Sequence, residues 1–153
     1  MTKIKANKAQ RKVPKELQFR QQVCFPLYSA SNAVVRAYRP YLDALDITYL
    51  QYMVLMVLWE EQSTNVKNLG ERLNLDSGTL TPLLKRLEAK QLVLRTRSKD
   101  DERNRIISIT KSGNALQEKA KHIPKSVAKK TGLTLAEHQQ LKSLCLKVVA
   151  SLN

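Results

Sequence analysis

The residue of this sequence best suited to redox chemistry is Cys24, which is followed by Phe25 and Pro26. A proline is comfortable only in the first turn of a helix. If a helix begins near Phe25, the partial positive charge of its N-terminus stabilises a thiolate at Cys24, and the thiolate is the nucleophile. If the helix begins earlier, Pro26 leaves a kink beside Cys24. A third interpretation is that Cys24 is a small buried hydrophobic residue, as most free cysteines are.

A second set of candidate residues lies between Asp76 and Thr110. In the first part of this segment apolar residues recur at the spacing of a helix: Leu80, Leu83, Leu84 and Leu87. The other faces of this helix carry hydroxyl and basic groups: Thr79, Thr81, Lys85 and Arg86. Two β-prone runs follow, 92–98 and 105–110, and the charged loop 99–104 between them is typical of a β-hairpin.

A helix followed by a charged hairpin suggests a winged helix. In such a unit the helix lies in the major groove and the hairpin tip reaches the DNA backbone or the minor groove. An ordinary solvated helix and hairpin would show the same pattern, because amphipathic helices with a basic outer face are common.

The preceding segments predict the elements that position this unit. A helix is expected over 23–45, with Pro40 breaking or kinking it. Thr48 and Gln51 form a capping box for a central, buried helix over 49–61, and Ile47 can pack onto Tyr52. A short helix then begins at Thr64 or Asn65, and 74–76 form the turn of a helix-turn-helix. Pro82 leaves the start of the second helix open, with Thr79 or Thr81 as possible caps.

The C-terminal segment predicts a surface for a second copy of the chain. Thr110 or Ser112 caps a basic helix that Pro124 bends or interrupts, and Thr134 with Glu137 forms a capping box for a last helix. That helix carries a continuous apolar stripe: Leu141, Leu144, Cys145, Val148, Val149 and Leu152. With the apolar N-terminal helix, the stripe makes a natural dimer interface. A two-fold dimer places its two reading helices about 34 Å apart, one turn of DNA.

Composition narrows the function classes. The 153 residues fit one domain, and an apolar content of 42% argues against disorder. A net charge of +14 and a pI near 10.0 indicate a polyanionic partner, either nucleic acid or an anionic membrane surface. The longest apolar run, 52–59, is far shorter than the roughly 20 residues that cross a bilayer.

The N-terminal segment and the cysteines bear on location and on bound groups. Residues 1–22 hold seven Lys and Arg and no apolar core of a secretory signal, which predicts a flexible basic arm on a cytoplasmic protein. In a reducing compartment, the two cysteines Cys24 and Cys145 do not imply a disulfide. No spacing of Cys and His resembles a zinc site, so neither a metal nor a cofactor is expected.

The order of these elements resembles the MarR family of dimeric winged-helix transcription regulators, and within it the organic hydroperoxide sensors called OhrR. The segments that carry the resemblance are Cys24-Phe25, Leu27-Tyr28, Leu45 with Ile47-Thr48-Tyr49, Gln51-Tyr52, Leu58-Trp59-Glu60, the run from Leu75 to Pro82, Leu84-Lys85-Arg86 and Asp101-Glu102-Arg103. The resemblance covers about 20–150. It implies a fold that is mainly α-helical with a β-hairpin wing, in which 23–47 and 111–153 form the dimerisation helices and 48–110 bind DNA.

The resemblance also implies that an organic peroxide oxidises Cys24 to sulfenic acid, and that Tyr38 and Tyr49 hold its thiolate. Cys24 and Tyr38 are 14 residues apart, which is about 21 Å along a continuous helix. The tyrosines are therefore expected to come from the other subunit. Members with two cysteines resolve the sulfenate with a second cysteine, and here the corresponding region, 127–133, has none. A small thiol or overoxidation is expected to act at Cys24 instead, and Cys145 is expected to be packed in the core.

For DNA, the resemblance places Ser77, Thr79, Thr81, Lys85 and Arg86 at the major groove and Arg103 at the wing tip. Asp101 orients Arg103 by a charge-assisted hydrogen bond. Arg95, Arg97 and Arg105 are interpreted as phosphate contacts or as ordinary solvated side chains.

The sequence thus predicts a homodimeric repressor that binds a palindromic operator and is released by an organic hydroperoxide. Two alternatives stay open: a regulator of the same fold released by a small phenolic or aromatic-acid ligand, and an architectural DNA-binding protein that tolerates many sequences. A peroxide-reducing enzyme is disfavoured, because no resolving thiol accompanies Cys24.

Overall fold

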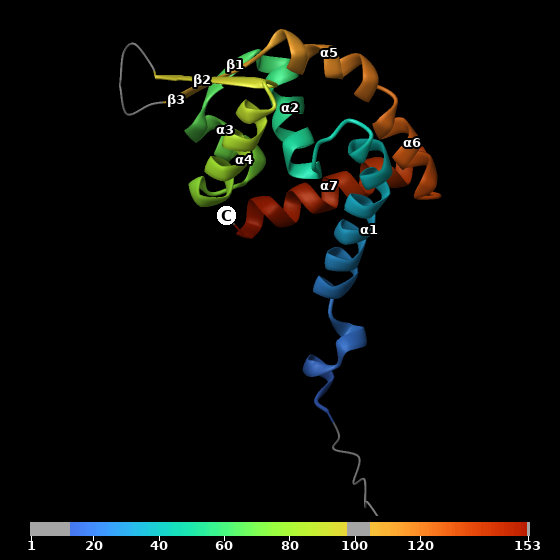
Figure 1. Ribbon diagram of the computed structural model, residues 1–153. Helices are drawn as coiled ribbons and strands as arrows, with labels where there is room; N and C mark the ends of the chain where they lie inside the picture. The colour runs from blue at the N-terminus through green and yellow to red at the C-terminus, as the bar shows by residue number, and fades with distance from the viewer. Residues whose placement is uncertain (1–12, 98–104, 153) are drawn as a thin grey trace, which may run out of the picture. The chain divides into compact units, whose positions relative to one another are not determined.

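The computed structural model describes residues 13–97 and 105–152 (Figure 1). The chain falls into two compact units, one extending to Val34 and the other beginning at Val35. Its elements are the short 3₁₀ helices η1 (Lys15–Leu17) and η2 (Phe19–Gln21), the helices α1 (Cys24–Asp43), α2 (Tyr49–Glu61), α3 (Val66–Leu73), α4 (Ser77–Ala89), α5 (Lys111–Ala120), α6 (Ile123–Lys130) and α7 (Leu135–Leu152), and the strands β1 (Ser63–Asn65), β2 (Val93–Arg97) and β3 (Arg105–Ile109). The predicted class, mainly α-helical with a small β wing, is confirmed. The basic arm predicted for 1–22 lies partly outside the described residues.

Helix α1 begins at Cys24, so Pro26 falls in its first turn, where no backbone donor is lost from the helix. The Leu27 amide donates to the Val23 carbonyl at 3.3 Å. Pro40 was expected to break or kink the helix; a break is wrong, because α1 continues to Asp43. Pro40 lies in the last turn, where it removes a single intrahelical hydrogen bond.

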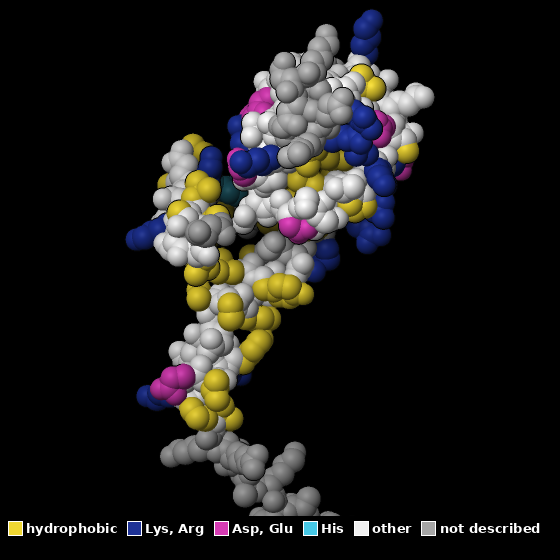
Figure 2. All heavy atoms as spheres, turned by 90° about the vertical axis from the view of Figure 1, so that its left-hand side faces the viewer, with side chains coloured by type: hydrophobic (Ala, Val, Ile, Leu, Met, Phe, Trp, Pro, Cys, Tyr) yellow, Lys and Arg dark blue, Asp and Glu magenta, His cyan; other side chains and the backbone are white. Residues whose placement is uncertain are grey.

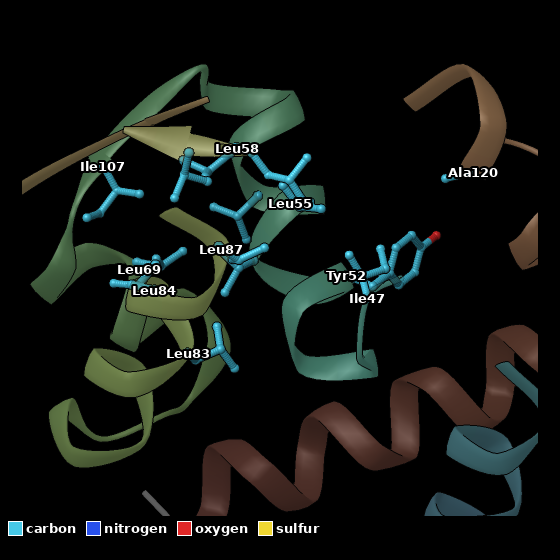
Figure 3. Close-up of a cluster of buried hydrophobic side chains, with 14 of the residues drawn as sticks. Ile47, Tyr52, Leu55, Leu58, Leu69, Leu83, Leu84, Leu87, Ile107 and Ala120 are labelled. Atoms are coloured by element: carbon cyan, nitrogen blue, oxygen red, sulfur yellow. The ribbon is translucent and has the colours of Figure 1, made fainter. Parts of the chain in front are cut away.

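Helix α2 lies in the middle of the core, as its apolar sequence predicts. The capping box is present: the Gln51 amide donates to Thr48 Oγ1 at 3.3 Å and the Thr48 amide donates to Gln51 Oε1 at 2.8 Å. The core around it combines residues of α2, α3, α4 and the strands, among them Leu55, Leu58, Leu69, Leu84, Leu87 and Ile107 (Figure 3). Burying these side chains from water is the main stabilising contribution to this unit.

The helix-turn-helix is formed by α3 and α4. The Asn68 amide donates to Asn65 Oδ1 at 2.8 Å, which caps α3, and Asn74 ends that helix in the left-handed conformation. Helix α4 is capped by Asp76, whose Oδ1 accepts from the Thr79 amide at 2.8 Å. The alternative caps Thr79 and Thr81 are therefore wrong. Pro82 lies within α4 without ending it.

The wing belongs to a three-stranded antiparallel sheet in the order β1-β3-β2. In its register Arg95 lies opposite Ile107 and Arg97 lies opposite Arg105. Ile107 is fully buried and holds the sheet against the core. The hairpin tip, 98–104, lies outside the described residues, and with it Asp101 and Arg103.

The C-terminal helices follow the predicted caps. Thr110 Oγ1 accepts from the Gly113 amide at 3.0 Å and caps α5. Pro124 lies in the first turn of α6, which confirms that the basic helix is interrupted. The amide and hydroxyl of Thr134 donate to Glu137 Oε2, and α7 begins there. Among the described residues, no helix is both long and apolar enough to span a membrane.

Candidate functional site

The exposed side of α4 carries the residues expected at the major groove. The Thr79 hydroxyl donates to Asp76 Oδ2 at 2.8 Å and the Thr81 hydroxyl donates to the Ser77 carbonyl at 2.8 Å. With their protons engaged in these bonds, both hydroxyl oxygens can act only as acceptors toward a further partner. Lys85 and Arg86 are exposed one turn further on. The hydrogen bonds from the Thr79 amide and hydroxyl hold the pKa of Asp76 below its ordinary value, so this cap stays ionised at neutral pH.

A cleft of about 620 Å³ lies between α3, α4 and the sheet. Its polar and charged lining comes from four elements: Lys67 and Glu71 of α3, Ser77 and Thr81 of α4, Arg95 of β2 and Arg105 of β3. Figure 2, viewed from the side of the wing, shows Lys and Arg side chains beside hydrophobic ones on this face. The arrangement offers hydrogen-bonding groups and positive charge to a polyanion, as a DNA-binding surface requires.

The three arginines predicted to contact phosphate differ in their surroundings. Arg97 and Arg105 are exposed on neighbouring strands. The Arg95 side chain is only 14% exposed, and its Nη1 lies 3.4 Å from Glu88 Oε2 of α4. Its Nε is buried and meets no partner among the described residues. Arg95 therefore ties the wing to α4, whereas Arg97 and Arg105 are exposed and form no ion pair with another described residue.

Replacing Arg105 by alanine is expected to weaken DNA binding on all duplexes and to reduce the slope of log affinity against log salt by about one unit, because one phosphate contact is lost. Arg95→Ala is expected to leave that slope unchanged while lowering affinity for the operator. Fluorescence anisotropy with a labelled duplex over a series of KCl concentrations measures both. A slope reduced by one unit in Arg95→Ala would instead make Arg95 a phosphate contact.

The two cysteines lie in different settings. Cys24 is exposed as the first residue of α1, so the interpretation that it is buried is wrong for this chain. Cys145 is partly exposed on α7, a helix with no buried residue. The core packing predicted for Cys145 is therefore not provided by the single chain.

The two tyrosines that the resemblance singles out are neighbours in space. The rings of Tyr38 of α1 and Tyr49 of α2 lie 5.1 Å apart between centroids, edge to face. A third ring, that of Tyr52, lies 5.8 Å from Tyr38. Burial raises the pKa of Tyr38 and of Tyr49, and raises the pKa of Tyr52 to about 12. All three hydroxyls thus stay protonated at neutral pH and can donate a hydrogen bond to an anion.

Sequence reasoning assigned Tyr52 only a packing role, as the partner of Ile47, and no role at this site. In the sequence it lies within the apolar run of α2, where a tyrosine is indistinguishable from an ordinary core residue. Its position beside Tyr38 follows from the packing of α1 against α2, which no local pattern encodes.

Alkaline pH is expected to destabilise the protein through Tyr52. In the unfolded chain this tyrosine ionises near its ordinary pKa of 10.0, whereas in the folded chain it ionises near 12. The stability that this raised pKa contributes is fully present below pH 10.0 and is lost as the pH rises toward 12. Urea unfolding from pH 9 upward should therefore show a shallower decline for Tyr52→Phe than for wild type. Equal declines would exclude Tyr52 as the cause.

Comparisons with known proteins agree with this geometry. A family model for transcriptional regulators of the SarA/Rot type matches residues 36–120. The chain is 46% identical over 128 residues to the organic hydroperoxide resistance transcriptional regulator of Bacillus subtilis, covering 84% of this chain and 85% of the relative.

Solved structures of AbfR, a protein of Staphylococcus epidermidis, show the same fold. Reduced AbfR bound to DNA is 33% identical, with a TM-score of 0.78 over 91% of this chain and 95% of the neighbour. AbfR with a disulfide formed is 32% identical, with a TM-score of 0.62 over 88% of this chain and 94% of the neighbour. Matched over more than half of its length, the chain belongs to the SarA/Rot family of transcriptional regulators, which are MarR-like winged-helix proteins and not enzymes.

Proposed function

We propose that this protein is a homodimeric repressor that binds operator DNA and releases it when an organic hydroperoxide oxidises Cys24. The observation that carries the proposal is the exposure of Cys24 at the first residue of α1, in a chain that is 46% identical to an organic hydroperoxide resistance regulator. An exposed thiol at the start of a helix is accessible to a peroxide.

The oxidation proceeds by attack of the Cys24 thiolate on the terminal oxygen of the hydroperoxide. The S–O bond forms as the O–O bond breaks, and the alkoxide that leaves takes up a proton to become an alcohol. Cys24 is then a sulfenic acid. A low-molecular-weight thiol condenses with it, giving a mixed disulfide and water. The added group is much larger than the thiolate that it replaces.

Tyr38 and Tyr49 are proposed to hold the thiolate of the reduced protein. Their hydroxyls remain protonated at neutral pH because burial raises the pKa of both groups. Within one chain Cys24 and Tyr38 lie 14 residues apart on the same helix, about 21 Å at 1.5 Å per residue. The tyrosines therefore act on Cys24 of the partner subunit. Oxidation then removes hydrogen bonds that cross the dimer interface.

DNA binding is proposed through α4 and the wing of each subunit. Helix α4 carries Ser77, Thr79, Thr81, Lys85 and Arg86. On the wing, Arg97 of β2 lies opposite Arg105 of β3. Phosphate contacts fix the position of the protein, and contacts to base edges select the operator. The likeness of this chain to AbfR solved in complex with DNA, with a TM-score of 0.78, supports DNA binding by the same fold.

The proposal is tested with the reduced protein and a palindromic duplex from the region upstream of its own gene. Operator affinity is measured before and after one equivalent of cumene hydroperoxide, with a low-molecular-weight thiol present, and again after dithiothreitol. Mass spectrometry of the intact protein identifies the product at Cys24. We expect release on oxidation, a mass increase of one thiol, and restored binding after reduction. Unchanged affinity at full oxidation of Cys24 would overturn the proposal.

A further inference from the structure

Four aromatic side chains form a continuous row through the unit that begins at Val35. Its centroid spacings are 5.1 Å from Tyr49 to Tyr38, 5.8 Å from Tyr38 to Tyr52, and 5.9 Å from Tyr52 to Trp59. Rings at such distances are in contact. This aromatic row begins at the two tyrosines proposed to hold the sensor thiolate and ends at the far part of α2.

Trp59 is anchored where α5 meets the base of the wing. Its Nε1 donates to the Gly113 carbonyl of α5 at 3.0 Å. Gly113 is itself packed without room to spare, because a Cβ atom there would lie 2.2 Å from the Leu92 carbonyl and 2.8 Å from Ile109 Cγ1. Leu92 precedes β2 and Ile109 ends β3. Any displacement of the Trp59 anchor therefore presses on the two strands of the wing.

Tyr52 is the link between the two ends of the row. Its side chain is 3% exposed and belongs to the buried core. Figure 3 shows it at the edge of the core cluster, beside Ile47, with its hydroxyl pointing toward Ala120 of α5. On one side a cleft of about 250 Å³ borders Tyr52, Trp59 and Ala120, and within the row the Tyr52 ring contacts those of Tyr38 and Trp59. A displacement of the Tyr38 ring therefore acts on Tyr52, and through it on Trp59.

We propose that Tyr52 and Trp59 are positioning residues of the sensor, through which a change at Tyr38 reaches the base of the wing. The inference rests on the proposed function, since it takes Tyr38 to be the group that loses its partner on oxidation. It adds a physical connection between the sensor and the DNA-binding wing within one subunit, besides any change at the dimer interface. One end of the row contacts the sensor tyrosines and the other contacts the base of the wing, so a change at either site can alter the position of the row. Coupling between two sites requires such a shared element.

The sequence supplies its own reporter, because Trp59 is the single tryptophan of the chain. Tryptophan emission is recorded for the full-length reduced protein and after oxidation of Cys24 to the mixed disulfide, together with operator affinity. Wild type should show a change in Trp59 emission that accompanies release. Tyr52→Leu interrupts the row and should lose the emission change, whereas Tyr52→Phe keeps the ring and should retain it.

Coupling is measured separately as the ratio of operator affinities of the reduced and oxidised proteins. Trp59→Phe keeps a ring but removes the donor to Gly113, and is expected to reduce this ratio by about three- to tenfold. The rate at which Cys24 is oxidised should stay at the wild-type value. The matched control is Tyr41→Leu, since Tyr41 packs on His122 and Lys130 outside the row. This control should keep both the ratio and the emission change.

The outcomes separate this inference from the proposed function. If wild type releases the operator while Trp59 emission stays constant and Trp59→Phe keeps the full ratio, the row carries no signal and the repressor remains peroxide-sensing. If wild type does not release at all, the proposed function itself fails. If Tyr52→Leu fails to fold, Trp59→Phe still tests the inference, because its ratio of operator affinities is measured on a different protein.

Discussion

Cys24→Ser is expected to bind the operator as tightly as the wild-type protein and to stay bound after an organic hydroperoxide is added. A serine hydroxyl is not oxidised by a peroxide, so no sulfenic acid and no mixed disulfide forms. Cys24 is exposed, and its replacement by a residue of similar size leaves no cavity. For the wild-type protein, release corresponds to an affinity lowered by about tenfold or more, within the usual range for coupled sites. Anisotropy of a labelled operator at fixed salt measures both proteins.

Cys145→Ser is the matched control. Cys145 lies on α7 and is partly exposed, so an oxidant could reach both thiols. If Cys24 alone is the sensor, Cys145→Ser releases the operator as the wild-type protein does. Loss of release in both variants would indicate a disulfide between the two cysteines. Release that persists in Cys24→Ser would contradict the redox mechanism and favour a ligand-released regulator.

Helix α2 is predicted to the residue, because the signals at both of its ends are local. The range of α2, Tyr49–Glu61, follows from the capping box of Thr48 with Gln51 at one end and the end of the apolar run at the other. The interruption at Pro124 and the cap at Thr134 are equally local. In each case residues adjacent in the sequence determine the backbone conformation, so the sequence alone is sufficient to predict where the helix begins or ends.

The wrong predictions of secondary structure concern residues whose conformation depends on other parts of the fold or on a neighbouring cap. Strand β1 consists of Ser63, Thr64 and Asn65, which carry no β pattern and form a strand only because β3 pairs with them. The sequence does not fix the start of α4, because Pro82 argues for a late start and the cap Asp76 for an early one, and the structure follows the cap. The effect of Pro40 was overestimated because the helix ends three residues later.

The candidate site likewise combines features set by neighbouring residues with features set by tertiary packing. Tyr38 and Tyr49 were identified through a resemblance to known sensors, and neither shows in the sequence any feature that separates it from a core tyrosine. Their contact, and that of Tyr52, depends on how α1 packs against α2. The burial of Arg95 is likewise a tertiary feature, since the pairing with Glu88 joins a strand to the preceding helix.

Leu144→Glu is expected to dissociate the dimer and to lower operator affinity by two to three orders of magnitude. In the single chain no residue of α7 is buried, and Leu144 is 55% exposed beside Val148, Leu141 and Leu152. A carboxylate there is therefore compatible with the fold of the subunit. In a dimer that buries this stripe it would be an unpaired charge in an apolar interface, which costs about 3–5 kcal/mol. A monomer then contacts one half-site in place of two.

Sedimentation equilibrium and operator anisotropy measure the two effects on the same sample. Gln140→Glu is the matched control, because it adds the same charge to an exposed polar position of α7. It should stay dimeric and keep nearly the wild-type affinity, which excludes repulsion from DNA as the cause. If Leu144→Glu also stays dimeric, the apolar stripe of α7 is not the interface. In that case the exposed apolar residues of α1, such as Phe25 and Val35, become the surface to test.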